Sequence, residues 1–94
     1  IAYCASKGAL NTMTKSLARA LAPEIRVNAV CPGPIDSRWL RKDMSEEQIA
    51  QRVATFPIPK LSTPEDIADT VAYLATGTSM TTGQVLVVDG GRTM

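Results

Sequence analysis

The side chains best suited to chemistry are a tyrosine and a lysine near the start of the chain. Tyr3 and Lys7 are four residues apart, which places them on one face of a helix with Cβ atoms about 5–6 Å apart. An ammonium group at that distance favours the phenolate form of a tyrosine and so prepares it for acid–base work. The spacing therefore predicts a proton-transfer pair. The alternative is that Tyr3 packs at the edge of a core while Lys7 is solvated.

A second candidate is a loop that follows an apolar run. Arg26–Cys31 predicts a short strand buried on both faces, as in a parallel sheet covered by helices. Pro32, Gly33 and Pro34 end the strand in a loop with few engaged backbone N–H groups. Ligands bind beyond the carboxyl ends of parallel strands, and a glycine lets the backbone approach a planar ring. The segment therefore predicts a ligand-contacting loop, with an ordinary rigid turn as the alternative.

Helices with clear start and stop signals must position these residues. The periodic apolar residues from Tyr3 to about Leu21 predict a helix, which Pro23 ends. Ser45 and Gln48 predict a capping box at the start of a short helix. A further helix is predicted to begin with Thr63 as N-cap and Pro64 at its first position, and to end at Gly77.

A second strand completes an alternating pattern. Gln84–Val88 predicts another buried strand, which Asp89–Gly91 ends in a turn. The order of helices and strands predicts an α/β fold with parallel strands joined by a right-handed crossover. Two strands that need cover on both faces do not form a stable sheet alone. The chain, which begins with Ile1 and no initiator Met, is therefore expected to be part of a larger sheet with strands upstream.

Composition excludes several kinds of function. The net charge is +1 with no basic cluster, which argues against a nucleic-acid or membrane-surface partner. Histidine is absent, which removes Ser-His-Asp and Cys-His catalysis and the commonest metal ligand, so no metal site is expected. Cys4 and Cys31 are predicted to be buried apolar side chains rather than redox groups. Two unpaired thiols favour a reducing, cytoplasmic location.

Four blocks in a fixed order carry a resemblance to a known family. They are Tyr3–Leu10 (YCASKGAL), Arg26–Ser37 (RVNAVCPGPIDS), Thr63–Ala68 (TPEDIA) and Thr82–Gly91 (TGQVLVVDGG). The chain resembles the C-terminal half of a short-chain dehydrogenase/reductase, of the compact type that includes 3-oxoacyl-carrier-protein reductases. The resemblance implies that residues 1–94 are the C-terminal portion of one doubly wound, Rossmann-type domain whose N-terminal cofactor-binding half is absent.

The resemblance also implies roles for individual residues. Tyr3 matches the tyrosine that exchanges a proton with the substrate oxygen, and Lys7 matches the lysine that contacts the nicotinamide ribose and activates that tyrosine. Ser37 stands where the family usually has threonine. Serine keeps the hydroxyl that reaches the cofactor in the family. The contacts implied for NAD or NADP come from Tyr3, Lys7, Pro32, Gly33, Ile35 and Ser37.

Residues 38–61 correspond to the substrate lid of the resembling family. Trp39, Leu40, Met44 and Phe56 are candidate walls for an apolar or acyl substrate, such as a 3-oxoacyl compound. The alternative for each side chain is simple packing of a surface helix. Trp39 is the favoured wall because its neighbours in the sequence are polar.

The family's glycine-rich phosphate loop and its catalytic serine are not among these residues. The chain alone is therefore expected to be inactive, as part of an enzyme that transfers hydride between a nicotinamide and a carbonyl or secondary alcohol. The resemblance further implies a homo-oligomer, a dimer or tetramer. A second hypothesis is a non-catalytic fragment or association module that keeps the first helix and the last strand.

Overall fold

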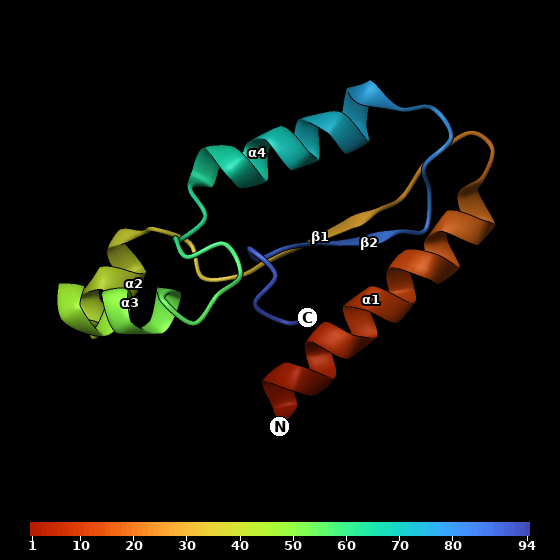
Figure 1. The fold of residues 1–94 in the computed structure, drawn as a ribbon. Helices are drawn as coiled ribbons and strands as arrows, with labels where there is room; N and C mark the ends of the chain where they lie inside the picture. The colour runs from red at the N-terminus through yellow and green to blue at the C-terminus, as the bar shows by residue number, and fades with distance from the viewer.

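The fold is an α/β arrangement in which two helices lie on opposite sides of a small parallel sheet. A computed structural model describes residues 1–94. Helix α1 (Ala2–Leu21) leads to strand β1 (Ala29–Pro32), and helix α4 (Pro64–Ala72) leads to strand β2 (Val85–Val88). Figure 1 shows α4 above the sheet and α1 below it. The parallel sheet and the crossover between its strands confirm the predicted fold class.

The sheet is held in a single register. The two strands pair in parallel, with Ala29 opposite Val85 and Pro32 opposite Val88. Strand β1 begins at Ala29 rather than at the predicted Arg26, and it includes Pro32. The start was predicted wrongly because the Val27 N–H donates to Thr82 Oγ1 at 3.1 Å instead of to a ladder carbonyl. The Val27 carbonyl still accepts from the Gly83 N–H at 2.7 Å, so the two segments are joined ahead of the ladder by one main-chain and one side-chain bond.

The sheet is less covered than the sequence predicts. Leu86 and Val87 in β2 are 40% and 52% exposed, so these strands are not buried on both faces. The prediction that both cysteines are buried is also wrong, because Cys4 is exposed and Cys31 is only half-buried. Position within an apolar run does not by itself decide whether a side chain is covered.

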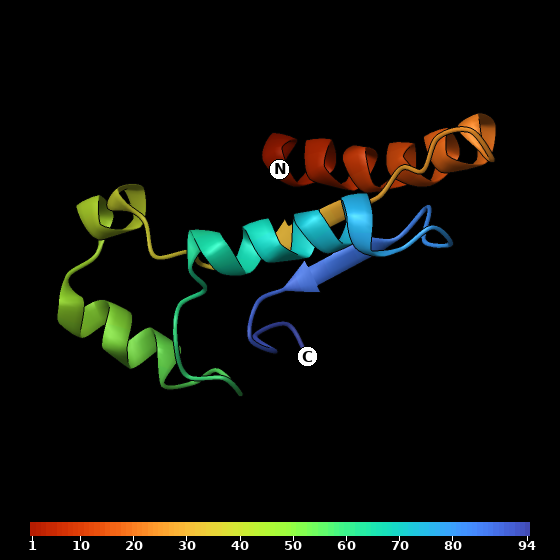
Figure 2. The same cartoon turned by 90° about the horizontal axis from the view of Figure 1, so that it is seen from above.

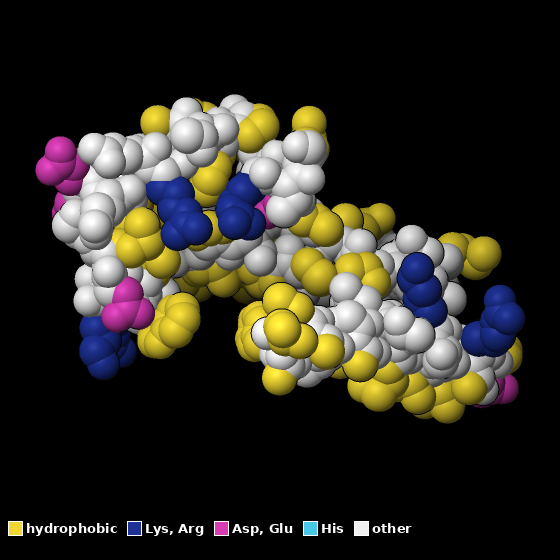
Figure 3. Space-filling model, turned by 90° about the horizontal axis from the view of Figure 1, so that it is seen from below, with side chains coloured by type: hydrophobic (Ala, Val, Ile, Leu, Met, Phe, Trp, Pro, Cys, Tyr) yellow, Lys and Arg dark blue, Asp and Glu magenta, His cyan; other side chains and the backbone are white.

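Helix α1 uses its small residues for packing. Thr14 and Ala18 are its buried residues, and a methyl group at Gly83 would contact Ala18 Cβ at 3.4 Å. The larger apolar residues of α1 are 37–50% exposed; they are Leu10, Met13, Leu17 and Leu21. Figure 3, seen from below, shows hydrophobic side chains along this side of the molecule. The helix therefore presents an uncovered apolar stripe.

Two short helices, α2 (Arg38–Asp43) and α3 (Glu46–Val53), fill the connection after β1. They lie together at one end of the molecule, away from α1 (Figures 1 and 2). The predicted capping box of α3 is present, since Ser45 Oγ accepts from the Gln48 N–H and Gln48 Oε1 accepts from the Ser45 N–H. Helix α2 was not predicted, although Ser37 caps it.

The end of α4 differs from its prediction. The helix begins with Thr63 as N-cap and Pro64 at the first position, as predicted. It then continues as a π-helical segment, η1 (Tyr73–Gly77), so Gly77 is not a left-handed C-cap. A methyl group at Gly77 would lie 2.7 Å from Cδ2 of the Tyr73 ring. The glycine is therefore explained by the ring packed against it rather than by a terminal turn.

Candidate active site

Tyr3 and Lys7 lie together on the first turns of α1. Lys7 Nζ is 5.4 Å from the centre of the Tyr3 ring, within the range of a cation–π contact. Tyr3 is 72% exposed, so its hydroxyl is open to solvent. Helix α1 runs opposite to the strands, and its first turn lies toward their carboxyl ends (Figures 1 and 2). The start of α1 therefore lies toward the end of the sheet at which α/β proteins bind ligands.

The loop after β1 is more firmly held than the sequence predicts. The Gly33 N–H donates to Val88 O at 2.9 Å, and the Asp36 N–H donates to Ser62 O at 2.8 Å. Ile35 pairs with Ser62 in an isolated parallel bridge. The expectation of few engaged N–H groups is wrong because the residues before α4 run beside the loop. Main-chain bonds therefore fix the positions of Gly33 and Ile35.

Gly33 lies against the residue that follows β2. A methyl group at Gly33 would lie 2.6 Å from Asp89 Cβ and 2.9 Å from Asp89 Cα. Those distances are below any normal carbon–carbon contact, so only glycine fits here without movement. The sequence argument assigned this glycine to close approach of a ligand. In the structure the requirement for glycine comes from Asp89, which fills the place of a side chain.

Ser37 serves as the N-cap of α2. Its Oγ accepts a hydrogen bond from the Leu40 N–H at 3.2 Å. A hydroxyl has one donor and two acceptor lone pairs, so its O–H remains free after this bond. The capping role is thus compatible with a second bond to a cofactor, and it fixes where that hydroxyl lies.

The candidate lid residues fall into two groups. Trp39 is 77% exposed and makes no core contact, whereas Phe56 is 8% exposed and buried. Leu40 and Met44 are half-buried and border a small cavity with Ile49 of α3. Trp39 is therefore the candidate side chain that is free to meet another molecule, while Leu40 and Met44 lie between α2 and α3.

An ion-pair cluster that was not foreseen from the sequence joins the loop to helices α2 and α3. Arg41 Nε donates to Asp36 Oδ1 at 2.7 Å, and Arg41 Nη1 pairs with Glu46 of α3. The hydrogen bond from Arg41 holds the pKa of the Asp36 carboxyl below its usual range, and Asp36 in turn raises the pKa of Arg41. The signal in the sequence that could have predicted this cluster is the pair of opposite charges, Asp36 and Arg41, on either side of Ser37.

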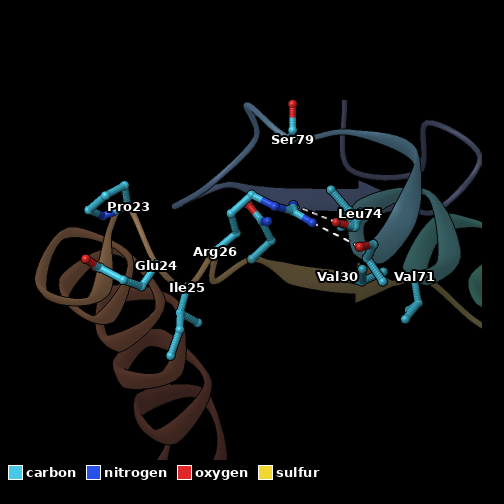
Figure 4. Close-up of a pocket in the computed structure, with 10 residues that line it drawn as sticks. Pro23, Glu24, Ile25, Arg26, Val30, Val71, Leu74 and Ser79 are labelled. Carbon is cyan, nitrogen blue, oxygen red and sulfur yellow. Dashed lines mark hydrogen bonds between the residues drawn. The ribbon is translucent and has the colours of Figure 1, made fainter.

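A cavity of about 710 Å³ lies at the other end of the sheet. Figure 4 shows Arg26 reaching from the start of β1 toward η1, where its guanidinium donates to Leu74 O and Ala75 O. Those bonds are 2.7 and 3.0 Å long, and a third goes to Thr81 O at 3.1 Å. The cavity adjoins the amino ends of the strands, and its arginine is engaged, so it is not the candidate active site.

Sequence comparisons match this chain along nearly its whole length. The family model described as enoyl-(acyl carrier protein) reductase matches residues 1–93. The chain is 42% identical to 2-(S)-hydroxypropyl-CoM dehydrogenase 3 of Xanthobacter autotrophicus, covering 98% of this chain and 39% of that relative. An inactive 2-(S)-hydroxypropyl-CoM dehydrogenase 2 of the same organism is also 42% identical, with 98% and 43% covered. The chain thus spans about two-fifths of these relatives.

A shorter relative and three solved structures agree with these matches. The short-chain dehydrogenase/reductase homolog YusR of Bacillus subtilis is 38% identical, with 98% of this chain and 69% of YusR covered. The ligand-free aldohexose dehydrogenase of Thermoplasma acidophilum is 37% identical with a TM-score of 0.91, covering 98% of this chain and 40% of that one.

The second structure is 3-oxoacyl-[acyl-carrier protein] reductase of Brucella melitensis, 38% identical with a TM-score of 0.88, covering 98% and 35%. The third is a small-chain dehydrogenase in complex with NADPH, 38% identical with a TM-score of 0.75, covering 89% and 39%. The family model and these structures match nearly the same residues of the chain. The chain therefore belongs to the short-chain dehydrogenase/reductase family.

Proposed function

We propose that the chain forms part of an oxidoreductase that transfers hydride between NAD or NADP and a carbonyl or secondary alcohol, with Tyr3 as the acid–base residue. The observation that carries the proposal is the placement of Tyr3 and Lys7 on one helix face, at the end of α1 that lies toward the carboxyl ends of the strands (Figure 1). Membership of an oxidoreductase family supports it.

The residues present suit a nicotinamide cofactor. Ser37 retains a free O–H, and Lys7 has no ion-pair partner in the chain. Asp89 takes the place of a Gly33 side chain, so Gly33 would contribute its main chain alone. The proposed contacts therefore come from the main chain of Pro32, Gly33 and Ile35, the hydroxyls of Tyr3 and Ser37, and the ammonium of Lys7. When bound, the cofactor would supply or accept the hydride.

The role proposed for Tyr3 is proton transfer to or from the substrate oxygen. In carbonyl reduction the Tyr3 O–H bond breaks and its proton passes to the substrate oxygen, which becomes a hydroxyl. The positive charge of Lys7 stabilises the phenolate that remains. The exposed face of the Tyr3 ring leaves the hydroxyl accessible to a substrate. Alcohol oxidation runs the same proton movement in reverse.

Residues 38–61 are proposed as the substrate lid, with Trp39 as its contacting wall. Leu40 and Met44 would act less directly, because they pack against α3. An acyl substrate of the 3-oxoacyl type fits an apolar wall of this kind. The likeness to 3-oxoacyl-[acyl-carrier protein] reductase supports this class without distinguishing it from other carbonyl compounds.

The experiment that tests the function is Tyr3→Phe in the full-length protein. Turnover of NAD(P)H with a panel of ketones should fall by at least about 10²-fold, the scale of general acid catalysis. Cofactor affinity, measured by quenching of protein fluorescence, should stay within about three-fold, since removing one neutral hydroxyl contact costs little. A Phe variant that keeps its rate would refute the assignment of Tyr3.

A second candidate function is subunit association without catalysis. The uncovered apolar stripe of α1 favours it, and a relative named as inactive matches the same residues at the same identity as an active one. The stripe would pair with a second copy, giving a dimer or tetramer. Both functions expect an oligomer in light scattering of the full-length protein, so turnover of NAD(P)H distinguishes them: an association module stays oligomeric and shows no turnover.

A further inference from the structure

The turn after β2 lies between two segments that belong to the candidate site. On one side, the Gly33 N–H bonds to Val88 O at 2.9 Å, and Asp89 Cβ fills the space where a Gly33 side chain would be. On the other side, the Ile58 N–H donates to Gly90 O at 3.0 Å. The turn therefore contacts both the cofactor loop and the end of the lid segment.

The contact with the lid segment also depends on close packing. A methyl group at Gly91 would lie 2.9 Å from Pro57 Cγ. Gly90 and Gly91 have φ values of 66° and 83°, a left-handed conformation that side chains rarely adopt. The turn thus reaches Pro57 and Ile58 only because two successive residues are glycines.

One buried carboxylate organises the turn. Asp89 is 8% exposed. Its Oδ1 accepts from the Gly91 N–H at 2.9 Å, and its Oδ2 accepts from the Thr93 N–H at 3.0 Å and the Thr93 hydroxyl at 2.7 Å. All three donors come from the turn itself, so the side chain is engaged in shaping residues 89–93.

We propose that Asp89 is a positioning residue: by closing the turn on itself, its carboxylate fixes the Gly33 loop and the Pro57–Ile58 end of the lid segment relative to each other. The site-related part of this inference rests on the proposed function. The same turn would then hold both the loop that contacts the cofactor and the segment that covers the substrate. Loosening the turn would loosen both contacts together.

The first test is amide hydrogen exchange on the full-length protein with Asp89→Asn, which keeps the size of the side chain and removes its charge. The Gly33 and Ile58 amides should exchange about five- to thirty-fold faster, the change expected when a local opening becomes easier. The Ala29 amide, bonded to Gln84 O at 2.8 Å at the far end of the same sheet, is the internal reference. Equal acceleration at all three amides, or none, would overturn the proposal.

A milder pair of variants guards against a variant that fails to fold. Thr93→Val removes the hydroxyl that donates to Asp89, whereas Thr93→Ser keeps it. We expect faster exchange at Gly33 and Ile58 with valine and rescue with serine. Faster exchange with both substitutions, or with neither, would contradict the role of this bond. None of these measurements needs an active enzyme, so their outcome is independent of the proposed function.

The second test separates positioning from stability. In the full-length enzyme, Asp89→Asn should raise the KM for the nicotinamide cofactor several-fold while kcat at saturating cofactor stays near the wild-type value. A fall in kcat with an unchanged KM would refute the positioning role. If the wild-type protein shows no turnover of NAD(P)H, the proposed function fails, and the exchange measurements alone decide the inference.

Discussion

Arg26 is expected to be a principal stabilising side chain, because it joins the start of β1 to the end of η1. Its guanidinium donates to Leu74 O, Thr81 O and Ala75 O, and the first two bonds are partly buried. The substitution Arg26→Met keeps most of the apolar stem and removes all three donors. The carbonyls at the end of the helix would then lose their partner and the positive charge that complements the helix dipole.

The size of the effect follows from how open the site is. A hydrogen bond from a charged group contributes about 1.5–3 kcal/mol when it is shielded from water. The adjoining cavity of about 710 Å³ lets water reach the freed carbonyls, so each partly buried bond falls at the low end of that range. The bond to Ala75 is exposed and adds little. The total loss in the free energy of unfolding should be about 2–3 kcal/mol.

Urea unfolding of the full-length protein, followed by circular dichroism, measures this loss. Arg26→Lys is the graded control, because one ammonium keeps the charge but cannot serve three carbonyls in a fixed geometry. Arg38→Met is the matched control, since Arg38 is exposed and should change stability by no more than about 0.5 kcal/mol. If Arg26→Met also stays within about 0.5 kcal/mol of the wild type, the stabilising role of Arg26 is refuted.

Three further outcomes are expected. Lys7→Ala should weaken cofactor binding and lower the rate together, measured by fluorescence titration and initial rates; an unchanged affinity would count against its ribose contact. Hydrogen bonds, that from the Thr93 hydroxyl foremost, hold the pKa of Asp89 below its ordinary 3.8. Its stabilising contribution is therefore present above about pH 4 and lost as pH falls through the lower, folded-state pKa. The urea midpoint of Asp89→Asn should accordingly depend less on pH in that acidic window, and an identical dependence would contradict this. Thr63→Ala should destabilise the start of α4 by about 1 kcal/mol, with Thr63→Ser close to wild type; equal urea midpoints for the two would show that the cap contributes nothing.

Local signals in the sequence predicted the helices well. The Ser45 and Thr63 caps are where the sequence places them, because a cap depends on a side chain and a main-chain group only three residues away. Tyr3 and Lys7 lie on one helix face for the same reason. Helix periodicity alone is sufficient for such statements.

Features that depend on distant residues were predicted less well. The observed start of β1 differs from the predicted start because Thr82, 55 residues away along the chain, bonds to the Val27 N–H. The Arg41 cluster and the contact between Gly33 and Asp89 likewise join separate segments. Sequence periodicity carries no information on which segments meet, so the candidate site was identified by residue type while its supports were not.

The parallel pairing of β1 with β2 also has a consequence for synthesis. Ala29 pairs with Val85, so the first strand has no partner in this sheet until the ribosome has added the 56 residues that separate the two positions. At about 5–20 residues per second, that interval is about 3–11 s. Helix α1 can form locally within it, whereas β1 presents unpaired main-chain groups. The pairing between β1 and β2 therefore forms only late, after Val85 and its neighbours have been translated.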